Sequence, residues 1–252
     1  MRCIILCGGA RENTIKHLFE SGGVEISKIY IPDKIKIIER LKKVIAFAEA
    51  NNIAVEKVSK EQCNELDNHN SEVLISLGWN YKVSSGLISK FKYAINVHPT
   101  LLPKYRGYRS GAYILINGEK QSGVTVHLLE DGIDNGDIIY QEVFDISVFD
   151  TPKSMKEKID KIEGPALVKA LLILQSGESS FTKQNEQEAT YYDKIRTPED
   201  SVVDWECSLK DLYNQIRACD PDDYPAFFWL EGEKVYIRLY RKNKSEKEAQ
   251  MI

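Results

Sequence analysis

The most constraining feature of this sequence is the spacing of apolar residues along its first 175 positions. Short runs rich in β-branched residues alternate there with longer segments in which apolar residues recur at every third or fourth position. The short runs are typical of buried strands, and the longer segments are typical of amphipathic helices. Strands and helices that alternate in this way build a parallel sheet covered by helices. The spacing therefore predicts an α/β fold.

The predicted strands and helices can be placed along the chain. The strands are Cys3–Cys7, Val24–Ile31, Ile53–Val58, Val73–Leu77, Ala94–Val97, Val124–Leu129 and Ile138–Phe144. The helices are Asn13–Glu20, Ile35–Ala50, Val83–Phe91, a short one ending at Ile116, and a long one from Pro152 to Leu174. Thr151 and Pro152 are typical of the cap and the first turn of the long helix. We expect a Rossmann-like, mostly parallel sheet.

A polar stretch at residues 179–189 shows neither helical nor strand periodicity. We interpret it as a linker across the surface, with one domain before it at residues 1–178. Residues 190–252 are then expected to form a small C-terminal α+β subdomain. Its predicted elements are a helix at Leu209–Arg217 and a hairpin made of Ala226–Leu230 and Val235–Leu239.

Charge and cysteine content exclude several classes of protein. The chain has 252 residues with 34 Lys and Arg against 38 Asp and Glu, so its net charge is −4, which disfavours general binding to nucleic acid. Five cysteines, an odd number without a C-x-x-C pair, indicate neither a disulfide framework nor a zinc site. No apolar run approaches the ~18 residues that would span a membrane. We expect a cytoplasmic protein.

Asn96 and His98 stand at the end of the predicted strand Ala94–Val97, two positions apart. Side chains at this spacing lie on the same side of a strand, and ligands of open α/β sheets bind beyond the carboxyl ends of strands. An amide donor beside an imidazole suits acyl transfer, in which an oxyanion develops and a proton moves. Such a pair also serves to cap loops, so the pattern leaves both readings open.

A second polar cluster covers residues 130–137, with four carboxylates and two glycines in eight positions. A calcium loop of the EF-hand type needs a flanking pair of helices, whereas both flanks here are predicted strands. A polar turn whose glycines serve only the backbone is the other alternative.

Taken together, these clusters resemble the folate-dependent formyltransferases. The resemblance is carried by an Asn-x-His-Pro stretch with Leu-Leu-Pro-x-Tyr-Arg-Gly after it, by Gly-Val-Thr-x-His, and by an Asp- and Gly-rich loop. The matching residues are 96–107 (NVHPTLLPKYRG), 123–127 (GVTVH) and 131–136 (DGIDNG). Thr100 replaces the usual serine, and Tyr108-Arg109-Ser110 replaces the small residues and proline common in relatives.

The resemblance implies that 10-formyltetrahydrofolate gives its formyl group to an amine, without a metal. Asn96 and His98 would stabilise the oxyanion, and His98 would also handle a proton. Asp134 matches the family's catalytic aspartate and would orient His98 and accept the amine proton. His127, in contrast, is interpreted as a structural histidine of a strand.

The resemblance also indicates where the substrates would bind. The folate would lie between the loop at residues 78–82 and the loop at residues 128–133, against Trp79, Tyr81, Leu128, Gly132 and Ile133. The acceptor would contact the turn after the first strand and a loop arginine, through Gly8, Gly9, Arg11 and Arg106. Glycines allow close approach of a phosphate, and arginine pairs with it. Buried packing of the two rings and a plain strand-to-helix turn are the alternatives.

The C-terminal residues favour one branch of the family. Arg196-Thr197-Pro198-Glu199-Asp200 and Asn214-Gln215-Ile216-Arg217-Ala218 resemble segments of the transfer-RNA and sugar-nucleotide branches. The segment is short for the basic barrel of the transfer-RNA branch. We therefore predict an N-formyltransferase that acts on a UDP- or dTDP-linked amino-dideoxy sugar of surface-glycan biosynthesis. A homodimer is compatible with this prediction. The alternatives are a methionyl-tRNA formyltransferase, a module that formylates an aminoacyl carrier protein, and a folate-binding protein without catalysis.

Overall fold

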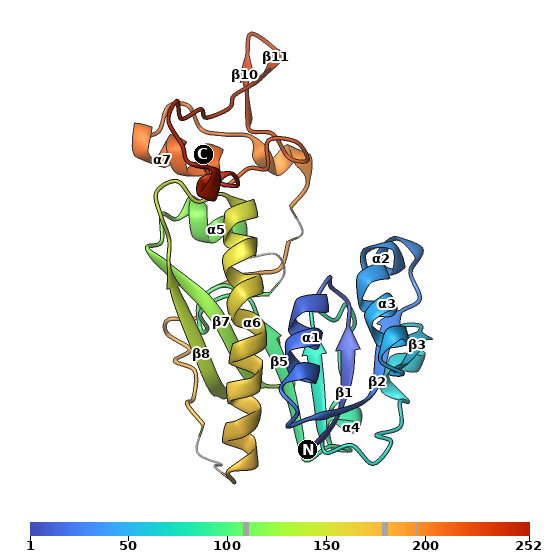
Figure 1. Ribbon diagram of the computed structural model, residues 1–252. Coiled ribbons are helices and arrows are strands. Elements are labelled where there is room, and N and C mark those ends of the chain that lie inside the picture. The colour runs from blue at the N-terminus through green and yellow to red at the C-terminus, as the bar shows by residue number, and fades with distance from the viewer. Residues whose placement is uncertain (108–110, 178–180, 195) are drawn as a thin grey trace.

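The structure is a computed structural model of the chain, and it describes residues 1–107, 111–177, 181–194 and 196–252 (Figure 1). The predicted boundary between the domain and the linker, at residues 178–179, lies outside the described residues. Tyr108-Arg109-Ser110 also lie outside them.

The described part of the chain contains one large sheet, whose strand order is β3-β2-β1-β4-β5-β7-β8. Its five parallel strands neighbour one another, and β7 and β8 are each antiparallel to the strand before them. The mostly parallel, Rossmann-like sheet is therefore confirmed. The bounds are β1 Arg2–Cys7, β2 Glu25–Pro32, β3 Ala54–Val58, β4 Val73–Leu77, β5 Tyr93–His98, β7 Gln121–Leu128 and β8 Ile138–Asp145.

Helices cover both faces of this sheet. The helices on the first face are α1 (Glu12–Glu20), α3 (Lys42–Ala50) and α6 (Pro152–Gln175), and their buried side chains join the large core cluster with inward residues of β1, β4 and β5. On the other face, α4 (Ser85–Ile88) contributes Leu87 to a second cluster. In Figure 1, α1 and α6 stand side by side in front of the strands. This packing follows from the apolar face of each helix.

Two predicted helices differ from the structure. The segment 35–50 is split into α2 (Ile35–Arg40) and α3 at Leu41, whose φ of −94° and ψ of 3° leave the helical region. Leu41 is fully buried, so the bend turns its side chain and those of Val44 and Ala48 into the core. The segment 83–91 forms only one turn of helix, α4, and Phe91 reaches the second core cluster from the turn that follows.

The C-terminal residues form a small α+β unit beside α5 (Gly111–Ile116), at the upper end of the molecule in Figure 1. Its elements are the short helix Pro198–Ser201, α7 (Leu209–Arg217), the hairpin strands β10 (Phe227–Leu230) and β11 (Glu233–Tyr236), and a last turn at Glu246–Glu248. Two short strands, β6 (Arg106–Gly107) and β9 (Tyr191–Tyr192), pair in parallel. None of the helices described here is both long and apolar enough to cross a membrane.

The strand order reverses direction between β1 and β4, so the loops after these two strands lie next to each other. Gly8, in the first loop, donates its backbone N–H to the carbonyl of Leu77 at 3.1 Å. A Cβ atom at Gly8 would lie 2.4 Å from the carbonyl oxygen of Gly78, so only glycine fits where the loops touch. A reversal point of this kind is where open α/β sheets bind their ligands.

Candidate functional site

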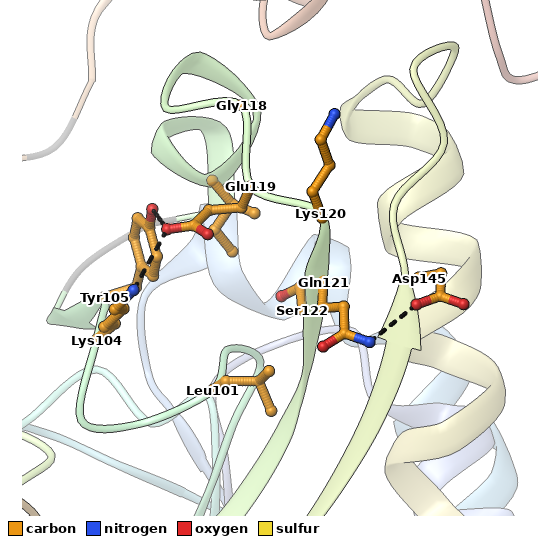
Figure 2. Close-up of a pocket in the computed structure, with 10 residues that line it drawn as sticks. Leu101, Lys104, Tyr105, Gly118, Glu119, Lys120, Gln121, Ser122 and Asp145 are labelled. Atoms are coloured by element: carbon orange, nitrogen blue, oxygen red, sulfur yellow. Dashed lines mark hydrogen bonds and ion pairs between the residues drawn. The ribbon is translucent and has the colours of Figure 1, made fainter.

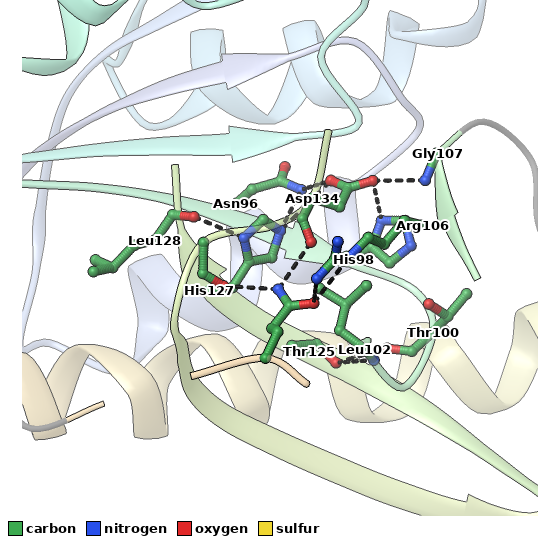
Figure 3. A network of polar contacts seen from close by, with 12 residues as sticks. Asn96, His98, Thr100, Leu102, Arg106, Gly107, Thr125, His127, Leu128 and Asp134 are labelled. Carbon is green, nitrogen blue, oxygen red and sulfur yellow. Dashed lines mark hydrogen bonds and ion pairs between the residues drawn. The ribbon is translucent and has the colours of Figure 1, made fainter. Parts of the chain in front are cut away.

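A polar network assembles at the end of β5, beside the reversal point (Figure 3). Asn96 and His98 come from β5, His127 comes from β7, and Asp134 comes from the loop between β7 and β8. The register of the antiparallel pair places Asn96 opposite His127. The structure thus brings together the three residues that the sequence marked as catalytic, although Asp134 is 36 positions or more away from the other two in the chain.

Asp134 is the centre of this network. One carboxylate oxygen, Oδ1, accepts from Nδ2 of Asn96 at 3.2 Å and lies 3.6 Å from Nε2 of His127. The other, Oδ2, accepts the backbone N–H of Gly107 at 2.9 Å and lies 3.4 Å from Nδ1 of His98. Burial acts to raise the pKa of Asp134, but the two histidines and the Gly107 N–H lower it well below its usual range. The carboxylate is therefore ionised at neutral pH.

The hydrogen bonds of His98 decide its tautomer. Nε2 lies 2.9 Å from the carbonyl oxygen of Tyr105, which can only accept, so the proton of the neutral ring is on Nε2. Burial lowers the pKa of His98 below its ordinary value of 6.5, while the Asp134 carboxylate partly offsets this effect. Nδ1 of the neutral ring therefore presents a lone pair to the Asp134 carboxylate. The pair has no proton between its facing atoms and can take one up.

His127 belongs to the same network, and the sequence analysis missed this. Its Nδ1 lies 2.7 Å from the carbonyl oxygen of Leu128, so Nε2 is the acceptor and receives a hydrogen bond from Nδ2 of Asn96 at 3.1 Å. His127 is the last residue of the family motif at residues 123–127, which was the one indication of its importance in the sequence. Only the antiparallel register, which a local pattern does not give, shows that this strand histidine faces Asn96.

Arg106 lies in a different setting from the one expected for an acceptor-binding residue. Its side chain is fully buried, and all five of its N–H donors are engaged within the chain. Nε donates to Gln184, one terminal nitrogen donates to Glu186 and Tyr191, and the other donates to Gln184 and Glu186. The structure therefore corrects the expectation that Arg106 offers donors to an acceptor, because no donor of its guanidinium is left over.

The two loops expected to hold the folate meet beside the network. Lys82 and Asp131 join them through an ion pair of 2.8 Å. Ile133 is 56% exposed in the Asp134 loop, Gly132 is next to it, and Leu128 is half-buried. Trp79 and Tyr81 pack edge to face with ring centroids 5.3 Å apart, and the Tyr81 hydroxyl donates to Asp33.

Arg11 lies in the loop after β1, and its positive charge adds to the lowering of the pKa of His98, for which burial is the largest cause. Nε of Arg11 lies 3.2 Å from Oε1 of the buried Glu163 on α6, and the arginine side chain is 17% exposed. A Cβ at Gly9 would meet no atom closer than 3.9 Å, so the backbone there is open to close approach. Gly8, in contrast, is needed for the packing of the two loops.

Two cavities of the described chain lie away from these residues. The first has a volume of about 440 Å³ and lies between α5, the start of β7 and the end of β8 (Figure 2). Tyr105 lines it, and its hydroxyl donates to Glu119 at 2.8 Å. The second, of about 280 Å³, lies between the start of α6 and the C-terminal unit. None of the predicted donor-binding or acceptor-binding residues lines either cavity.

Comparison with known proteins decides the family. The sequence model described as "Formyl transferase" matches residues 30–171, which are more than half of the chain. The chain belongs to the formyl transferase family. A second model, "Formyl transferase, C-terminal domain", matches residues 196–251. A methionyl-tRNA formyltransferase of Streptococcus suis strain 05ZYH33 is 30% identical over 207 residues, covering 78% of this chain. The alignment spans 66% of that relative, just under two thirds of its length.

Solved structures of the formyl transferase family share the fold. A 4-N formyltransferase from Francisella tularensis superposes with a TM-score of 0.77 at 20% identity, covering 96% of this chain and 98% of that one. An N-formyltransferase from Helicobacter canadensis, in complex with folinic acid and dTDP-3-aminofucose, superposes with a TM-score of 0.72 at 22% identity. The match covers 93% of this chain and 85% of that one. WlaRD, a sugar 3N-formyl transferase solved with dTDP and 5-N-formyl-THF, superposes with a TM-score of 0.71 at 23% identity. The match covers 93% of this chain and 84% of that one.

Proposed function

We propose that this protein transfers a formyl group from 10-formyltetrahydrofolate to the amine of a UDP- or dTDP-linked amino-dideoxy sugar. The observation that carries formyl transfer is the assembly of Asn96, His98 and Asp134 around one point at the end of β5. Membership of the formyl transferase family supports the same reaction.

The sugar acceptor is supported by the extent of the structural match. WlaRD, a sugar 3N-formyl transferase, matches 93% of this chain over 84% of its own, and the Francisella 4-N formyltransferase matches 96% over 98%, so both matches extend into the C-terminal unit. About one third of the transfer-RNA relative, in contrast, lies outside the matched part. A net charge of −4 also argues against a polynucleotide acceptor, because binding of a polynucleotide depends on a cationic protein surface.

In the proposed reaction, the amine nitrogen forms a bond to the formyl carbon, the bond from that carbon to N10 of the folate breaks, and N10 receives a proton. Asn96 stabilises the negative charge that develops on the formyl oxygen. Its Nδ2 group donates to His127 and to Asp134 in the free protein, and the contact with Asp134, at 3.2 Å, is the longer of the two. We propose that this donor turns to the formyl oxygen during the reaction.

The His98 and Asp134 pair takes the proton that the amine loses. The ionised Asp134 and the unprotonated Nδ1 of His98 face each other at 3.4 Å. A proton that arrives at either atom is shared in a hydrogen bond with the other, which lowers the cost of accepting it. The same proton is then available for N10, so the pair serves first as base and then as acid.

The folate supplies an activated formyl group, and the chain offers a fitting surface for its flat ring. The exposed Ile133 and the half-buried Leu128 provide apolar contact, and we propose that the backbone of Gly132, between them in the loop, forms a hydrogen bond with the ring. Trp79 and Tyr81, in the loop at residues 78–82, pack edge to face against each other, which restricts the motion of that loop. For the acceptor, we propose that Gly9 and Arg11 contact the diphosphate, with Gly8 keeping their loop in place.

Mass spectrometry tests this proposal. The protein is incubated with 10-formyltetrahydrofolate and with each of a panel of UDP- and dTDP-linked 3-amino and 4-amino sugars. We expect one sugar nucleotide to gain a single formyl group, with an Asp134→Asn protein as the matched inactive control. Binding of folinic acid by calorimetry without formylation of any sugar would overturn the acceptor half of the proposal alone.

A methionyl-tRNA formyltransferase is the second candidate, because the Streptococcus suis relative is 30% identical. The two candidates differ in their dependence on salt. Binding of charged transfer RNA weakens steeply with salt concentration, whereas binding of a small nucleotide changes far less. Formylation of methionyl-tRNA at a rate above that of every sugar nucleotide would favour this second candidate.

The lowered pKa of His98 predicts how the proton acceptor responds to pH. Asp134 and His127 face the imidazole within the network and Arg11 acts on it from the loop after β1, but burial dominates. Protonation of Nδ1 then occurs only below pH 6.5, and the proton acceptor is lost as the pH falls through this lowered pKa. We expect His98 to titrate below 6.5 by NMR of the free protein. A midpoint at or above 6.5 would contradict the neutral assignment.

We also propose that two copies pair through the C-terminal hairpin. Trp229, Leu230 and Tyr236 are 53%, 46% and 61% exposed on β10 and β11, next to the half-exposed Trp205. The hairpin is a two-stranded sheet in which Val202 bridges the outer edge of β10 at Phe227, so a second copy can add its own strand at the β11 edge or cover the aromatic face by two-fold symmetry. Sedimentation equilibrium should show a dimer that Trp229→Glu converts to a monomer; a wild-type monomer would refute the pairing.

The proposed cellular location is the cytoplasm. All five cysteines are free thiols, and four of them are buried. Reducing compartments keep such thiols unpaired, and burial raises the pKa of the Cys3 and Cys7 thiols to about 12, which keeps them unreactive.

A further inference from the structure

Residues 181–192 run across the catalytic unit as a strap rather than away from it. Thr182 forms a two-way backbone bridge with Ile138 at the start of β8, with distances of 2.8 and 3.0 Å. The carbonyl of Thr190 accepts from the backbone of Arg106, and Tyr191 and Tyr192 pair with Arg106 and Gly107. The strap is therefore attached to the start of β8 and to β6, so its role differs from that of a free linker.

Gln184, near the middle of the strap, uses all the hydrogen-bonding groups of its side-chain amide. Nε2 donates to the carbonyl oxygens of Asp134 at 2.8 Å and of Gly136 at 2.7 Å. Oε1 accepts from Nε and Nη2 of Arg106 at 3.0 and 2.7 Å. A flipped amide would place oxygen against the carbonyls and nitrogen against the guanidinium, so the surroundings allow only one orientation.

These contacts are made to Asp134, whose backbone conformation is unfavourable for a residue other than glycine. Asp134 has a φ of +50°, in the left-handed region that residues other than glycine seldom adopt. Its carbonyl is held by Gln184, while its carboxylate is held by the backbone of Gly107, the residue after Arg106. Gln184 and Arg106 thus connect the two segments that fix the direction of the Asp134 carboxylate.

We propose that Gln184 is a positioning residue that, through its amide and the buried Arg106, holds Asp134 facing His98. Arg106 accordingly holds Gln184 in place together with Glu186, since all of its donors are engaged within the chain. The kcat measurements that test this role rest on the proposed formyl transfer. The NMR titration of the free protein does not depend on that proposal.

The first test uses the free protein. Gln184→Met keeps the length of the side chain and removes all four hydrogen bonds of the amide, and Gln187→Met, at an exposed position of the same strap, is the matched control. The Asp134 carboxylate raises the pKa of His98 against the effect of burial, so a displaced carboxylate should let the pKa of His98 fall further. NMR titration should show this decrease for Gln184→Met and none for Gln187→Met. An unchanged His98 titration in Gln184→Met would overturn the proposal.

The second test separates positioning from general support of the fold. Gln184→Met should lower kcat roughly 10- to 100-fold, since small displacements of catalytic groups have effects of this size, with the KM of both substrates changed little. In an Asp134→Asn background the same change should cost almost nothing further, because Gln184 acts through Asp134. A full additional loss in the double variant would show a role that does not pass through Asp134.

A third variant keeps the proposal testable if Gln184→Met fails to fold. Gln184→Glu retains an acceptor for Arg106 and removes only the donors to Asp134 and Gly136, with Asn185→Asp as the control for the added charge. Loss of kcat in Gln184→Glu alone is expected. Equal activity in both proteins would overturn the role of the two donors. Absence of formylation in the wild-type protein would instead count against the proposed function, and the NMR titration would still decide on Gln184.

Discussion

Replacing Asp134 with asparagine should lower kcat at least about 100-fold, the scale of lost general acid–base catalysis. An amide has the shape of the carboxylate but does not accept the amine proton. The NH2 of the amide also faces either the Gly107 N–H or Nδ2 of Asn96, which are both donors, so part of the network is lost with the charge. The side chain is 16% exposed and the replacement is close in volume, so we expect a folded protein with a similar melting temperature.

Steady-state kinetics with saturating donor and acceptor provide the measurement. The control is Asp145→Asn, which makes the same chemical change at the exposed end of β8, away from the network. We expect full activity for the control and unchanged affinity of the Asp134→Asn protein for folinic acid. A kcat within about 3-fold of the wild-type value would remove Asp134 from the proton-transfer step.

The elements that the sequence predicted best are those with the strongest local patterns. β4 and α7 have the predicted bounds, Val73–Leu77 and Leu209–Arg217, because one is a continuous apolar run and the other has a clear apolar face. The long helix begins at Pro152 as expected, since Thr151 accepts the backbone N–H of Ser154 as its cap. Patterns within ten residues or so are sufficient for such elements.

The parts that escaped prediction depend on contacts between distant residues. Gln184 lies 50 positions from Asp134 and 78 from Arg106, and its polar surroundings in the sequence are typical of a surface loop. Arg106 was expected to meet the acceptor because it follows the Pro-x-Tyr stretch of the family motif. Only the folded chain shows Glu186 and Tyr191 against it. The motif identified where the site lies, but not which of its residues contact one another.

Two histidines of the site illustrate the same limit. Strand alternation correctly placed Asn96 and His98 on one side of β5, because both residues belong to the same strand. It gave no information on His127, whose position opposite Asn96 depends on the antiparallel pairing of β5 with β7. The tautomers of both rings depend in turn on the carbonyls of Tyr105 and Leu128.

Asn96→Ala should lower kcat by about 100- to 1,000-fold, as expected for removal of a single donor to an oxyanion. The change also removes a hydrogen bond from Asp134 Oδ1 and one from His127 Nε2. Asp134 keeps the backbone N–H of Gly107 at 2.9 Å, so the carboxylate stays close to His98. The loss should therefore fall on stabilisation of the formyl oxygen rather than on the proton acceptor.

Two measurements distinguish these contributions. The pKa of His98 in Asn96→Ala should stay close to that of the wild-type protein, whereas in Asp134→Asn it should fall, because the carboxylate that raises it is gone. Asn185→Ala, on the exposed strap, controls for loss of an asparagine amide and should keep its full rate. If Asn96→Ala shifted the His98 titration as far as Asp134→Asn does, Asn96 would act by holding Asp134. The formyl oxygen would then need a different donor.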